Sequence, residues 1–490
     1  MAFDVQRAAG LPHGAVTAQS SPDGGDLKAF LAPRTVAVIG ASVDQTKVGN
    51  VLLRNLRAAA CVERLYPINN RHGQIEGLTC YPSVSDVPGA IDLAVVALPA
   101  PAVPEAVEEC VACGVGAVLV VSSGFSESGP EGRELERRIA SAIAGTRTRL
   151  LGPNTLGYYI PSQDLDVVFL EKGTFPRPPA GHIGLVSQSG SLGVDFMFEL
   201  SSAGSGISMF LGLGNKLDVD ECDVLEQLAG DDDTRSIALY IESVTDGPRF
   251  LEACQRVVGR KPLVLLKGGR SRGGGKATAL HTGRMGGRYS VLKGVMDQLG
   301  VIEARDEVEL IDLARGLAAL PAPKGGRVLV ITNGGGNGIV AVDLLEGEWP
   351  GVLRMAELPD AFREELKGML PDFISPGNPL DLSSQATDRE YVKALRLAIK
   401  HDVADMYVLG VTASEWLTGS LVEGVAELSR RHGVPVVAYC KGNGEGSAMA
   451  RFLSGAGVPA YPSVHRASTV AGALTKYHSR RERTMAEGGG

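Results

Sequence analysis

One histidine stands out because of the residues around it. Residues 267–288, with the sequence KGGRSRGGGKATALHTGRMGGR, contain eight glycines, six Lys or Arg, no acid and a single histidine, His281. The apolar run just before them, residues 262–266, is typical of a buried parallel strand. Glycine frees the backbone, and long loops in compact domains are usually functional or disordered. We therefore predict a long, mobile, basic loop that presents an imidazole to an anionic, phosphorylated ligand.

This loop matches the Walker phosphate-binding loop only in part. The Walker motif requires a glycine where Arg270 stands, and a Ser or Thr where Ala277 follows Lys276. The segment is therefore not expected to cradle ATP directly. His281 is its most informative residue, with a satisfied structural histidine as the alternative.

An acid follows a neighbouring predicted strand. Residues 237–241, IALYI, read as a buried strand, and Glu242 comes directly after them. The carboxyl ends of parallel strands face the ligand crevice of such sheets. A carboxylate that accepts the Nδ1 proton of a histidine leaves Nε2 free as a nucleophile. Glu242 is thus a candidate partner of His281, and a surface acid that caps the next helix is the alternative.

Two turns between a predicted strand and a predicted helix are suited to anions, because backbone N–H groups and the helix dipole attract negative charge there. The candidate residues are Gly40, Ala41, Ser42 and Lys47 in the first turn, and Ser187, Gln188, Ser189 and Gly190 in the second. Either turn can instead be structural, the second as an ordinary N-cap. The first lacks the G-x-G-x-x-G fingerprint of NAD-binding folds and the acid that follows their second strand.

The composition limits the class of protein. The chain has 490 residues, 44% of them hydrophobic, and a net charge of −8, which argues against nucleic acid as the main partner. Seven scattered cysteines fit a reducing cytoplasm better than a disulfide framework, and the lone pair Cys110 and Cys113 reads as two small buried residues. No apolar run approaches the length of a membrane span, so we expect a cytoplasmic protein without membrane contact.

Strand and helix patterns alternate along the chain, which predicts parallel sheets covered by helices on both faces. We expect three doubly wound α/β domains over 26–174, 175–322 and 323–478, between a disordered extension at 1–25 and a flexible tail at 479–490. The turn at 333–338, NGGGNG, has no titratable residue next to it in the sequence and is read as structural.

Together these motifs resemble the NDP-forming acyl-CoA synthetases, the superfamily that includes succinyl-CoA ligase, and above all the α subunits of its ADP-forming acetyl-CoA synthetases. The resemblance covers residues 27–474. It is carried by the order and spacing of segments rather than by any one of them: Val38 to Ser42, Lys47 to Asn50, Gly152 to Asn154, Leu185 to Gly190, Asp218 to Asp220, Ala238 to Glu242, Ser271 to Gly283, Ile331 to Asn333 and Gly377 to Asp381.

The resemblance implies a fold and a set of roles. It implies a Rossmann-like CoA-binding domain followed by two flavodoxin-like ligase domains. His281 matches the histidine that becomes phosphorylated, and Glu242 matches the acid that orients it. The turn at Ser187 to Gly190 matches the phosphate-binding helix start, the turn at Gly40 to Ser42 with Lys47 matches the CoA site, and Asn154 matches a substrate contact. The implied reaction takes acyl-CoA, inorganic phosphate and ADP to a carboxylic acid, CoA and ATP, reversibly.

The chain has no room for the ATP-grasp domain that this superfamily uses to phosphorylate ADP. The resemblance therefore implies a separate β subunit that binds ADP or ATP with Mg²⁺, in an α2β2 heterotetramer. Some family positions differ, such as Arg284 and Met285 after the histidine motif, which leaves the identity of the acid open. Two alternatives are a carbamoyltransferase on the same scaffold, against which His281 counts, and a non-catalytic CoA-binding regulatory protein.

Overall fold

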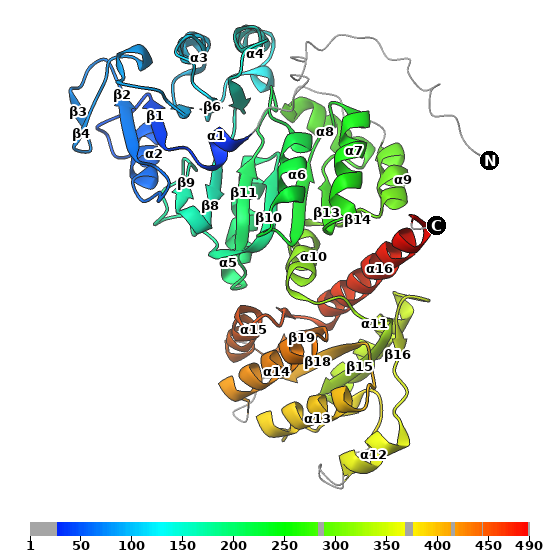
Figure 1. Cartoon of the computed structure of the whole chain (residues 1–490). Coiled ribbons are helices and arrows are strands. Elements are labelled where there is room, and N and C mark those ends of the chain that lie inside the picture. The colour runs from blue at the N-terminus through cyan, green and yellow to red at the C-terminus, as the bar shows by residue number, and fades with distance from the viewer. Residues whose placement is uncertain (1–26, 283–288, 368–375, 413–416, 443, 489–490) are drawn as a thin grey trace.

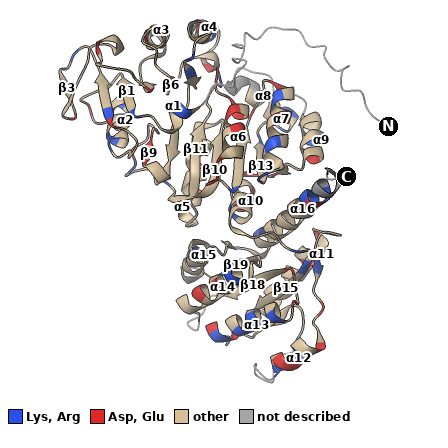
Figure 2. Cartoon of the chain, viewed as in Figure 1, with Lys and Arg blue, Asp and Glu red and all other residues tan. Residues whose placement is uncertain are grey.

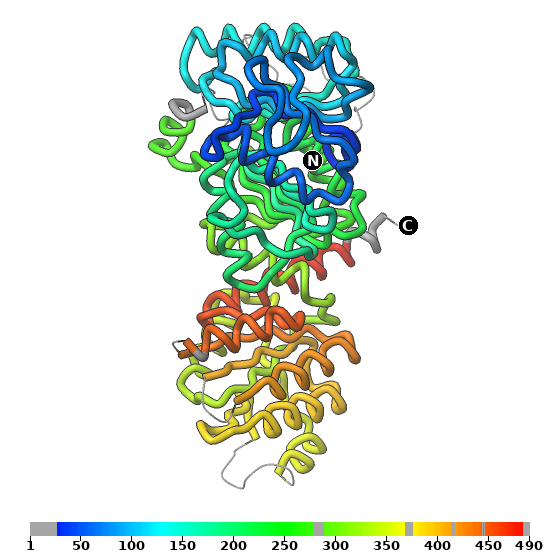
Figure 3. Tube along the Cα trace, turned by 90° about the vertical axis from the view of Figure 1, so that its left-hand side faces the viewer, coloured from blue at the N-terminus to red at the C-terminus, as the bar shows by residue number. Residues whose placement is uncertain are grey.

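The computed structural model describes residues 27–282, 289–367, 376–412, 417–442 and 444–488 (Figure 1). The extension predicted at 1–25 and residues 283–288 of the predicted basic loop lie outside this part. Three α/β domains follow one another along an elongated molecule, as the trace in Figure 3 shows. Charged residues gather on helices and strand ends, while the sheet interiors are largely free of them (Figure 2).

The first domain has a five-stranded parallel sheet in the order β2-β1-β5-β6-β7. Its strands are short apolar runs that helices cover on both faces; in β5, for example, every residue is buried. The elements are α1 (Lys28–Leu31), β1 (Thr35–Ile39), α2 (Val48–Leu56), β2 (Arg64–Ile68), β3 (Gln74–Ile75), β4 (Leu78–Thr79), η2 (Val84–Asp86), β5 (Leu93–Val96), η3 (Ala100–Ala102), α3 (Val103–Ala112), β6 (Ala117–Val120), η4 (Ser126–Ser128), α4 (Pro130–Ile143) and β7 (Arg149–Leu151).

The second domain has a seven-stranded sheet in the order β14-β13-β12-β10-β11-β8-β9, parallel except for β8, which is antiparallel to both of its neighbours. Its elements are β8 (Tyr158–Ile160), η5 (Pro161–Gln163), β9 (Leu165–Asp166), β10 (Ala180–Ser187), α5 (Gly190–Ser202), β11 (Ile207–Gly212), α6 (Glu221–Gly230), β12 (Ser236–Ile241), α7 (Gly247–Val258), β13 (Leu263–Lys267), α8 (Arg272–Thr282), α9 (Tyr289–Leu299), β14 (Ile302–Glu303) and α10 (Glu307–Ala319).

The predicted boundary between residues 174 and 175 does not coincide with the start of this sheet. Strands β8 and β9 precede residue 175, yet they extend the second sheet, with β8 antiparallel to β11. The proline-rich segment at 175–179 is therefore a connection within the second domain. Its prolines marked a turn correctly but could not show which sheet the preceding strands join.

The third domain repeats the same arrangement, with β15 between β16 and β18 in the order β16-β15-β18-β19-β20 and with β17 also paired to β15. Its elements are β15 (Arg327–Thr332), α11 (Gly335–Gly347), β16 (Arg354–Met355), α12 (Asp360–Lys367), β17 (Leu380–Asp381), α13 (Asp388–Lys400), β18 (Met406–Thr412), α14 (Gly419–His432), β19 (Val436–Lys441), α15 (Glu445–Gly455), β20 (Ala460–Tyr461) and α16 (Val464–Gly488). Helix α16 packs against α10 and so joins this domain to the second (Figure 1).

Two segments are more regular than predicted. The predicted flexible tail continues helix α16 to Gly488, and Arg480 donates a hydrogen bond to the carbonyl oxygen of Asp297 at 2.7 Å, at the end of α9. The predicted mobile loop contains helix α8, which begins after Ser271, whose hydroxyl accepts a hydrogen bond from the N–H of Gly274 at 3.0 Å. The run at 276–280, KATAL, favours a helix, and its propensity outweighs that of the glycines before it.

The three-domain fold class is confirmed: a Rossmann-like domain and two flavodoxin-like domains, in which β1, β10 and β15 each pair with strands on both sides. In the described part of the chain, no helix is both long and apolar enough to cross a lipid bilayer.

Candidate active site

The predicted site residues of the second domain meet at the carboxyl edge of its sheet, where the strand order reverses between β10 and β12. Such reversal points form the ligand crevices of doubly wound sheets. One cavity of about 420 Å³ lies here, and the predicted residues that line it are Asn154, Gln188, Ser189, Gly190 and Glu242. Among the predicted residues whose side chains the structure describes, the others lie outside this lining.

The side chain of Gln188 ties the two strand ends together. Its Oε1 accepts hydrogen bonds from the backbone N–H of Glu242 at 2.8 Å and of Ser243 at 3.2 Å. Its backbone N–H donates to the carbonyl oxygen of Tyr240 at 3.0 Å. All these groups are buried, so removal of the amide would leave backbone N–H groups without an acceptor. The position of Glu242 therefore depends on Gln188.

Glu242 is buried, and two buried lysines hold the backbone beside it. Its Oε1 accepts a hydrogen bond from the Tyr240 hydroxyl at 3.2 Å. The Nζ of Lys267 donates to the carbonyl oxygen of Glu242 at 2.6 Å, and the Nζ of Lys216 donates to that of Ser243 at 2.7 Å. Lys216 also pairs with Glu221 at 2.8 Å.

Burial lowers the pKa of the Lys267 ammonium to about 8. The nearby charge of Lys216 also lowers this pKa, whereas the carboxylate of Glu242 raises it. At neutral pH most of this group is still protonated. A positive charge therefore lies beneath the strand end that carries the carboxylate, which favours anions nearby.

The start of helix α5 offers hydrogen-bond donors to the cavity. Ser189 is the N-cap, and its hydroxyl accepts a hydrogen bond from the N–H of Leu192 at 3.4 Å. Among the described residues, nothing accepts a hydrogen bond from the backbone N–H of Gly190 or Ser191, and both residues line the cavity. Unpaired N–H groups at a helix start bind phosphate well.

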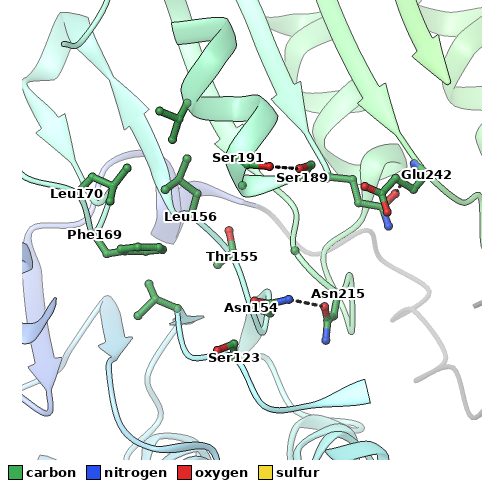
Figure 4. Close-up of a pocket in the computed structure, with 15 residues that line it drawn as sticks. Ser123, Asn154, Thr155, Leu156, Phe169, Leu170, Ser189, Ser191, Asn215 and Glu242 are labelled. Atoms are coloured by element: carbon green, nitrogen blue, oxygen red, sulfur yellow. Dashed lines mark hydrogen bonds between the residues drawn. The ribbon is translucent and has the colours of Figure 1, made fainter. Parts of the chain in front are cut away.

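The floor of the cavity joins the first two domains. Asn154, at a left-handed φ of 58°, donates from Nδ2 to Oδ1 of Asn215 at 3.3 Å (Figure 4). Asn215 in turn donates to Glu127 and Glu136 of the first domain, at 2.7 Å each. Although burial opposes it, hydrogen bonds from Asn215 and from the backbone of Phe125 lower the pKa of Glu127. An ionised Glu127 thus holds the side chain of Asn215 at the bottom of the cavity.

The predicted turn of the first domain is a separate site at the carboxyl edge of β1. Gly40 has a φ of +89°, and a Cβ on it would lie 2.4 Å from the carbonyl oxygen of Ala97. A Cβ on Gly49 would lie 2.1 Å from the carbonyl oxygen of Gly40, so α2 starts close against the end of β1. Lys47 is the N-cap of α2 and is exposed.

The two sites share one sheet edge. The hydroxyl of Ser122, after β6, donates to the carbonyl oxygen of Leu98, after β5, at 2.5 Å. Leu98 lies within 3.1 Å of where a Cβ of Gly40 would stand, and the neighbours of Ser122, Val121 and Ser123, line the cavity. A ligand bound at the Gly40 turn can therefore extend along this edge into the cavity.

His281 lies in the last turn of helix α8, and its side chain is outside the described part of the structure. A second cavity of about 200 Å³ separates the start of α8 from Glu242, with Lys267, Arg270 and Arg272 in its wall. Glu242 lines both cavities. Helix α8 also contacts η4 of the first domain, next to the Asn215 network. The helix that carries His281 therefore lies beside the site.

Sequence reasoning missed the buried lysines and Asn215. Lys267 stood at the head of the basic segment, and Lys216 lay two residues before the matched Asp218. Neither position suggests that the ammonium is buried under a strand end, because burial depends on how the domains pack. The amide of Asn215 left no signal either, since its carboxylate partners are far away in the sequence.

Three family descriptions match successive parts of the chain: a CoA binding domain over residues 34–161, a succinyl-CoA ligase like flavodoxin domain over 180–317 and a ligase-CoA domain over 328–486. The α subunit of acetate–CoA ligase [ADP-forming] I from Pyrococcus furiosus is 36% identical over 463 residues, which cover 92% of this chain and 97% of that one. The chain belongs to the NDP-forming acyl-CoA synthetase superfamily.

Two further proteins match most of the chain. Acetate–CoA ligase [ADP-forming] I from Archaeoglobus fulgidus is 36% identical over 388 residues, which cover 79% of this chain but only 55% of that longer protein. The solved structure of dinucleotide forming acetyl-coenzyme A synthetase 1 from Ca. Korarchaeum cryptofilum, in complex with phosphate and ADP, superposes with a TM-score of 0.86 at 32% identity, over 94% of this chain and 99% of that one. The resemblance inferred from motifs is thus confirmed.

Proposed function

We propose that the chain is the α subunit of an ADP-forming acyl-CoA synthetase, which reversibly couples thioester cleavage to nucleotide phosphorylation. One observation carries this proposal: the free N–H groups of α5 and the carboxylate of Glu242 meet in one cavity beside the helix that carries His281. In this superfamily member, that arrangement supplies a phosphate site, an orienting acid and a nucleophile.

Coenzyme A is proposed to bind at the carboxyl edge of the first sheet. Its phosphates would contact the Gly40 to Ser42 turn and Lys47, where backbone N–H groups and a cation are exposed. The thiol arm would follow the sheet edge past Leu98 to Ser123 in the cavity wall. The match to a CoA binding domain over this region supports the assignment.

The chemistry then has two steps on this chain. An oxygen of inorganic phosphate, held by the N–H groups of Gly190 and Ser191, attacks the thioester carbonyl; the carbon–sulfur bond breaks and the CoA thiolate leaves. A ring nitrogen of His281 next attacks the phosphorus of the acyl phosphate, and the carboxylic acid leaves. An unperturbed imidazole is largely neutral at pH 7 and can act as this nucleophile. Glu242 would stabilise the cationic ring, and Asn154 would contact the acyl substrate.

The third step is proposed to occur on a second subunit. A relative named as an α subunit matches this chain almost end to end, whereas a longer relative has nearly half its length beyond the match. We propose that a separate ATP-grasp β chain, with Mg²⁺, takes the phosphoryl group from His281 to ADP in a cytoplasmic α2β2 assembly. Seven free cysteines fit that compartment.

A reconstitution tests the function. The purified chain, acetyl-CoA, phosphate and ADP should give ATP only when an ATP-grasp protein, such as one encoded beside this chain, is added. ATP formation by the chain alone would overturn the two-subunit proposal. Absence of any acyl-CoA cleavage by the reconstituted pair, over a panel of acyl groups, would overturn the ligase assignment.

A further inference from the structure

Another cavity lies between the second and third domains, where α5 and α10 face α15 and the end of β19 (Figure 1). Its volume is about 550 Å³, within the range of about 300–1,000 Å³ that buries small organic ligands. It lies at the carboxyl edge of the third sheet, because Lys441 ends β19 and Pro462 follows β20. Ligands of doubly wound sheets bind outside this edge. None of the described active-site residues lines it.

The charges around this cavity are mostly positive. Its lining has four basic side chains and one acid: Arg315, Lys441, Arg451, Arg466 and Glu199. Gly446, in the first turn of α15, also lines it, so the positive end of that helix dipole faces the same space. Because the whole chain has a net charge of −8, this excess of cations is local. It attracts an anionic ligand.

Two of the cations are held in place by other side chains. Arg466, on α16, donates from Nη2 to Oδ1 of Asp312, on α10, at 2.7 Å and from Nε to the other oxygen. Arg315 donates from Nε to the Ser205 hydroxyl at 2.9 Å and from Nη2 to the Ser454 hydroxyl at 3.0 Å. Both guanidinium groups are therefore preorganised. Asp312 offsets one charge, but Nη1 of Arg466 has no hydrogen-bond partner among the described residues.

The other two cations are not engaged in this way. Within the described part of the chain, neither Lys441 nor Arg451 forms an ion pair or a side-chain hydrogen bond. Lys441 is half-buried and Arg451 is exposed. Cys440 also lines the cavity; it is only 5% exposed, and its Sγ has no partner in that same part of the chain. The ammonium, the guanidinium and the thiol can each donate a hydrogen bond to a phosphate oxygen.

The second domain contributes an apolar part of the lining. Val308 and Ile311 of α10 and Ala203 after α5 all line the cavity, and Val308 is 37% exposed. A bare inorganic ion would gain nothing from these side chains, whereas an organic group would be stabilised by burial against them. Glu199 belongs to this same domain, so a phosphate is better placed on the third-domain side, beside Lys441.

We propose that this cavity binds a phosphorylated organic molecule of nucleotide size, which bridges the second and third domains. Its phosphates contact Lys441, Arg451 and Arg466, and its organic part packs against Val308 and Ile311. The site is separate from the proposed CoA and phosphate sites. It does not depend on the acyl-CoA ligase function.

Calorimetry of the full chain with ADP tests the proposal. CoA and inorganic phosphate are present in excess to fill the two sites described above, without acyl-CoA or a partner subunit. We expect one ADP to bind per chain, and pyrophosphate to bind at least about tenfold more weakly because it has no organic part to bury. Absence of ADP binding would overturn the proposal. Equal affinities for ADP and pyrophosphate would contradict the contact with Val308 and Ile311.

Substitutions of two cations locate the ligand. Lys441→Ala and Arg451→Ala should each weaken ADP binding by at least about tenfold, because each removes a charge-assisted hydrogen bond to phosphate. Lys441→Arg, which retains the charge, should keep most of the affinity. Arg396→Ala, at an exposed position of α13, is the matched control and should leave it unchanged. An ADP affinity that survives both alanine substitutions would place the nucleotide elsewhere and overturn the site.

Discussion

The second and third domains contain the same strand-to-helix turn with different surroundings. β10 and β15 each pair with strands on both sides, and the residue after each of them carries an amide that bridges to the strand on one side. Oε1 of Gln188 accepts from the N–H groups of Glu242 and Ser243, while Oδ1 of Asn333 accepts from the N–H of Thr412 at 2.8 Å. Helices α5 and α11 then begin at Gly190 and Gly335. The fold alone therefore provides an anion-binding turn twice.

The ionisable groups around the two turns differ. At the second-domain turn, Glu242 ends the bridged strand, with Lys267 and Lys216 buried beneath it. At the third-domain turn, the described groups that contact the bridge are neutral, such as Thr332 and Tyr391, whose hydroxyl donates to the carbonyl oxygen of Gly410 at 2.5 Å. The amide bridge is common to both turns, whereas the bridged strand ends on a carboxylate with two buried lysines beneath it in the second domain.

The third-domain turn also corrects an expectation. The sequence showed no titratable group beside residues 333–338, but the structure places Asp381, at the end of β17, where a Cβ on Gly335 would lie 2.6 Å from its Oδ2. The cause is the pairing of β17 with β15, which brings together residues that lie far apart in the sequence. A carboxylate at this helix start disfavours a second anion there.

The largest expected effect comes from Glu242, the carboxylate that ends the strand bridged by the Gln188 amide. Glu242→Gln keeps the shape and the backbone bridge but removes the charge that orients and stabilises the histidine. We expect histidine phosphorylation to slow by about 10²–10⁴-fold, with CoA affinity unchanged, in single-turnover assays. Glu226→Gln, a surface change on α6, is the control. A large loss of CoA affinity in Glu242→Gln would contradict the assigned role.

The amides of Gln188 and Asn333 can each be removed by substitution and the two variants compared. Gln188→Ala and Asn333→Ala should each lower the free energy of unfolding, by about 1–3 kcal/mol, because the first leaves two buried backbone N–H groups without their acceptor and the second leaves the N–H of the half-buried Thr412 without its acceptor. Only Gln188→Ala should also reduce the rate of histidine phosphorylation strongly, since it releases Glu242. Denaturant titration and the same single-turnover assay compare them. If Asn333→Ala reduces that rate as much as Gln188→Ala does, the distinction between the domains is wrong.

Lys267 gives the second domain a pH dependence. Its folded pKa, about 8, lies below its ordinary value of 10.5, so the unfolded chain binds more protons between these two pH values. The stability contribution of this residue therefore rises with pH across that window, by about 2 kcal/mol. The difference in unfolding free energy between wild type and Lys267→Met, measured at pH 8 and near pH 10, should show this rise. A difference that stays flat or falls would contradict the burial of a charged lysine.

The smallest effect concerns the first residues of the two helices. A Cβ on Gly190 would meet only the Cβ of Leu156, at 3.7 Å, whereas a Cβ on Gly335 would meet Asp381. Gly190→Ala should therefore leave the free energy of unfolding unchanged or raise it by up to about 1 kcal/mol. Gly335→Ala should lower the free energy of unfolding slightly, because Asp381 must move to make room for the methyl group. Thermal unfolding of both variants distinguishes them. Destabilisation by Gly190→Ala but not by Gly335→Ala would mean that the two turns have been assigned the wrong surroundings.

Much of the fold was readable from local pattern. The run at 35–39 forms β1 and the run at 263–266 lies within β13, because short apolar segments between turn residues have few alternatives. The helical state of α8 was not predicted, because the three consecutive glycines at 273–275 favour a loop more strongly than the run KATAL after them favours a helix. The lysines beneath Glu242 and the Asn215 network could not be predicted for a different reason: each is made by residues from separate strands or domains.

We propose that His281 carries the phosphoryl group. The full chain, incubated with acyl-CoA and radiolabelled phosphate and without nucleotide or partner, should acquire protein-bound label that is labile to acid and stable to base. His281→Ala should acquire none while still binding CoA. Label that persists in His281→Ala, or a wild-type chain that binds CoA and cleaves its thioester but never becomes labelled, would contradict this account of the site.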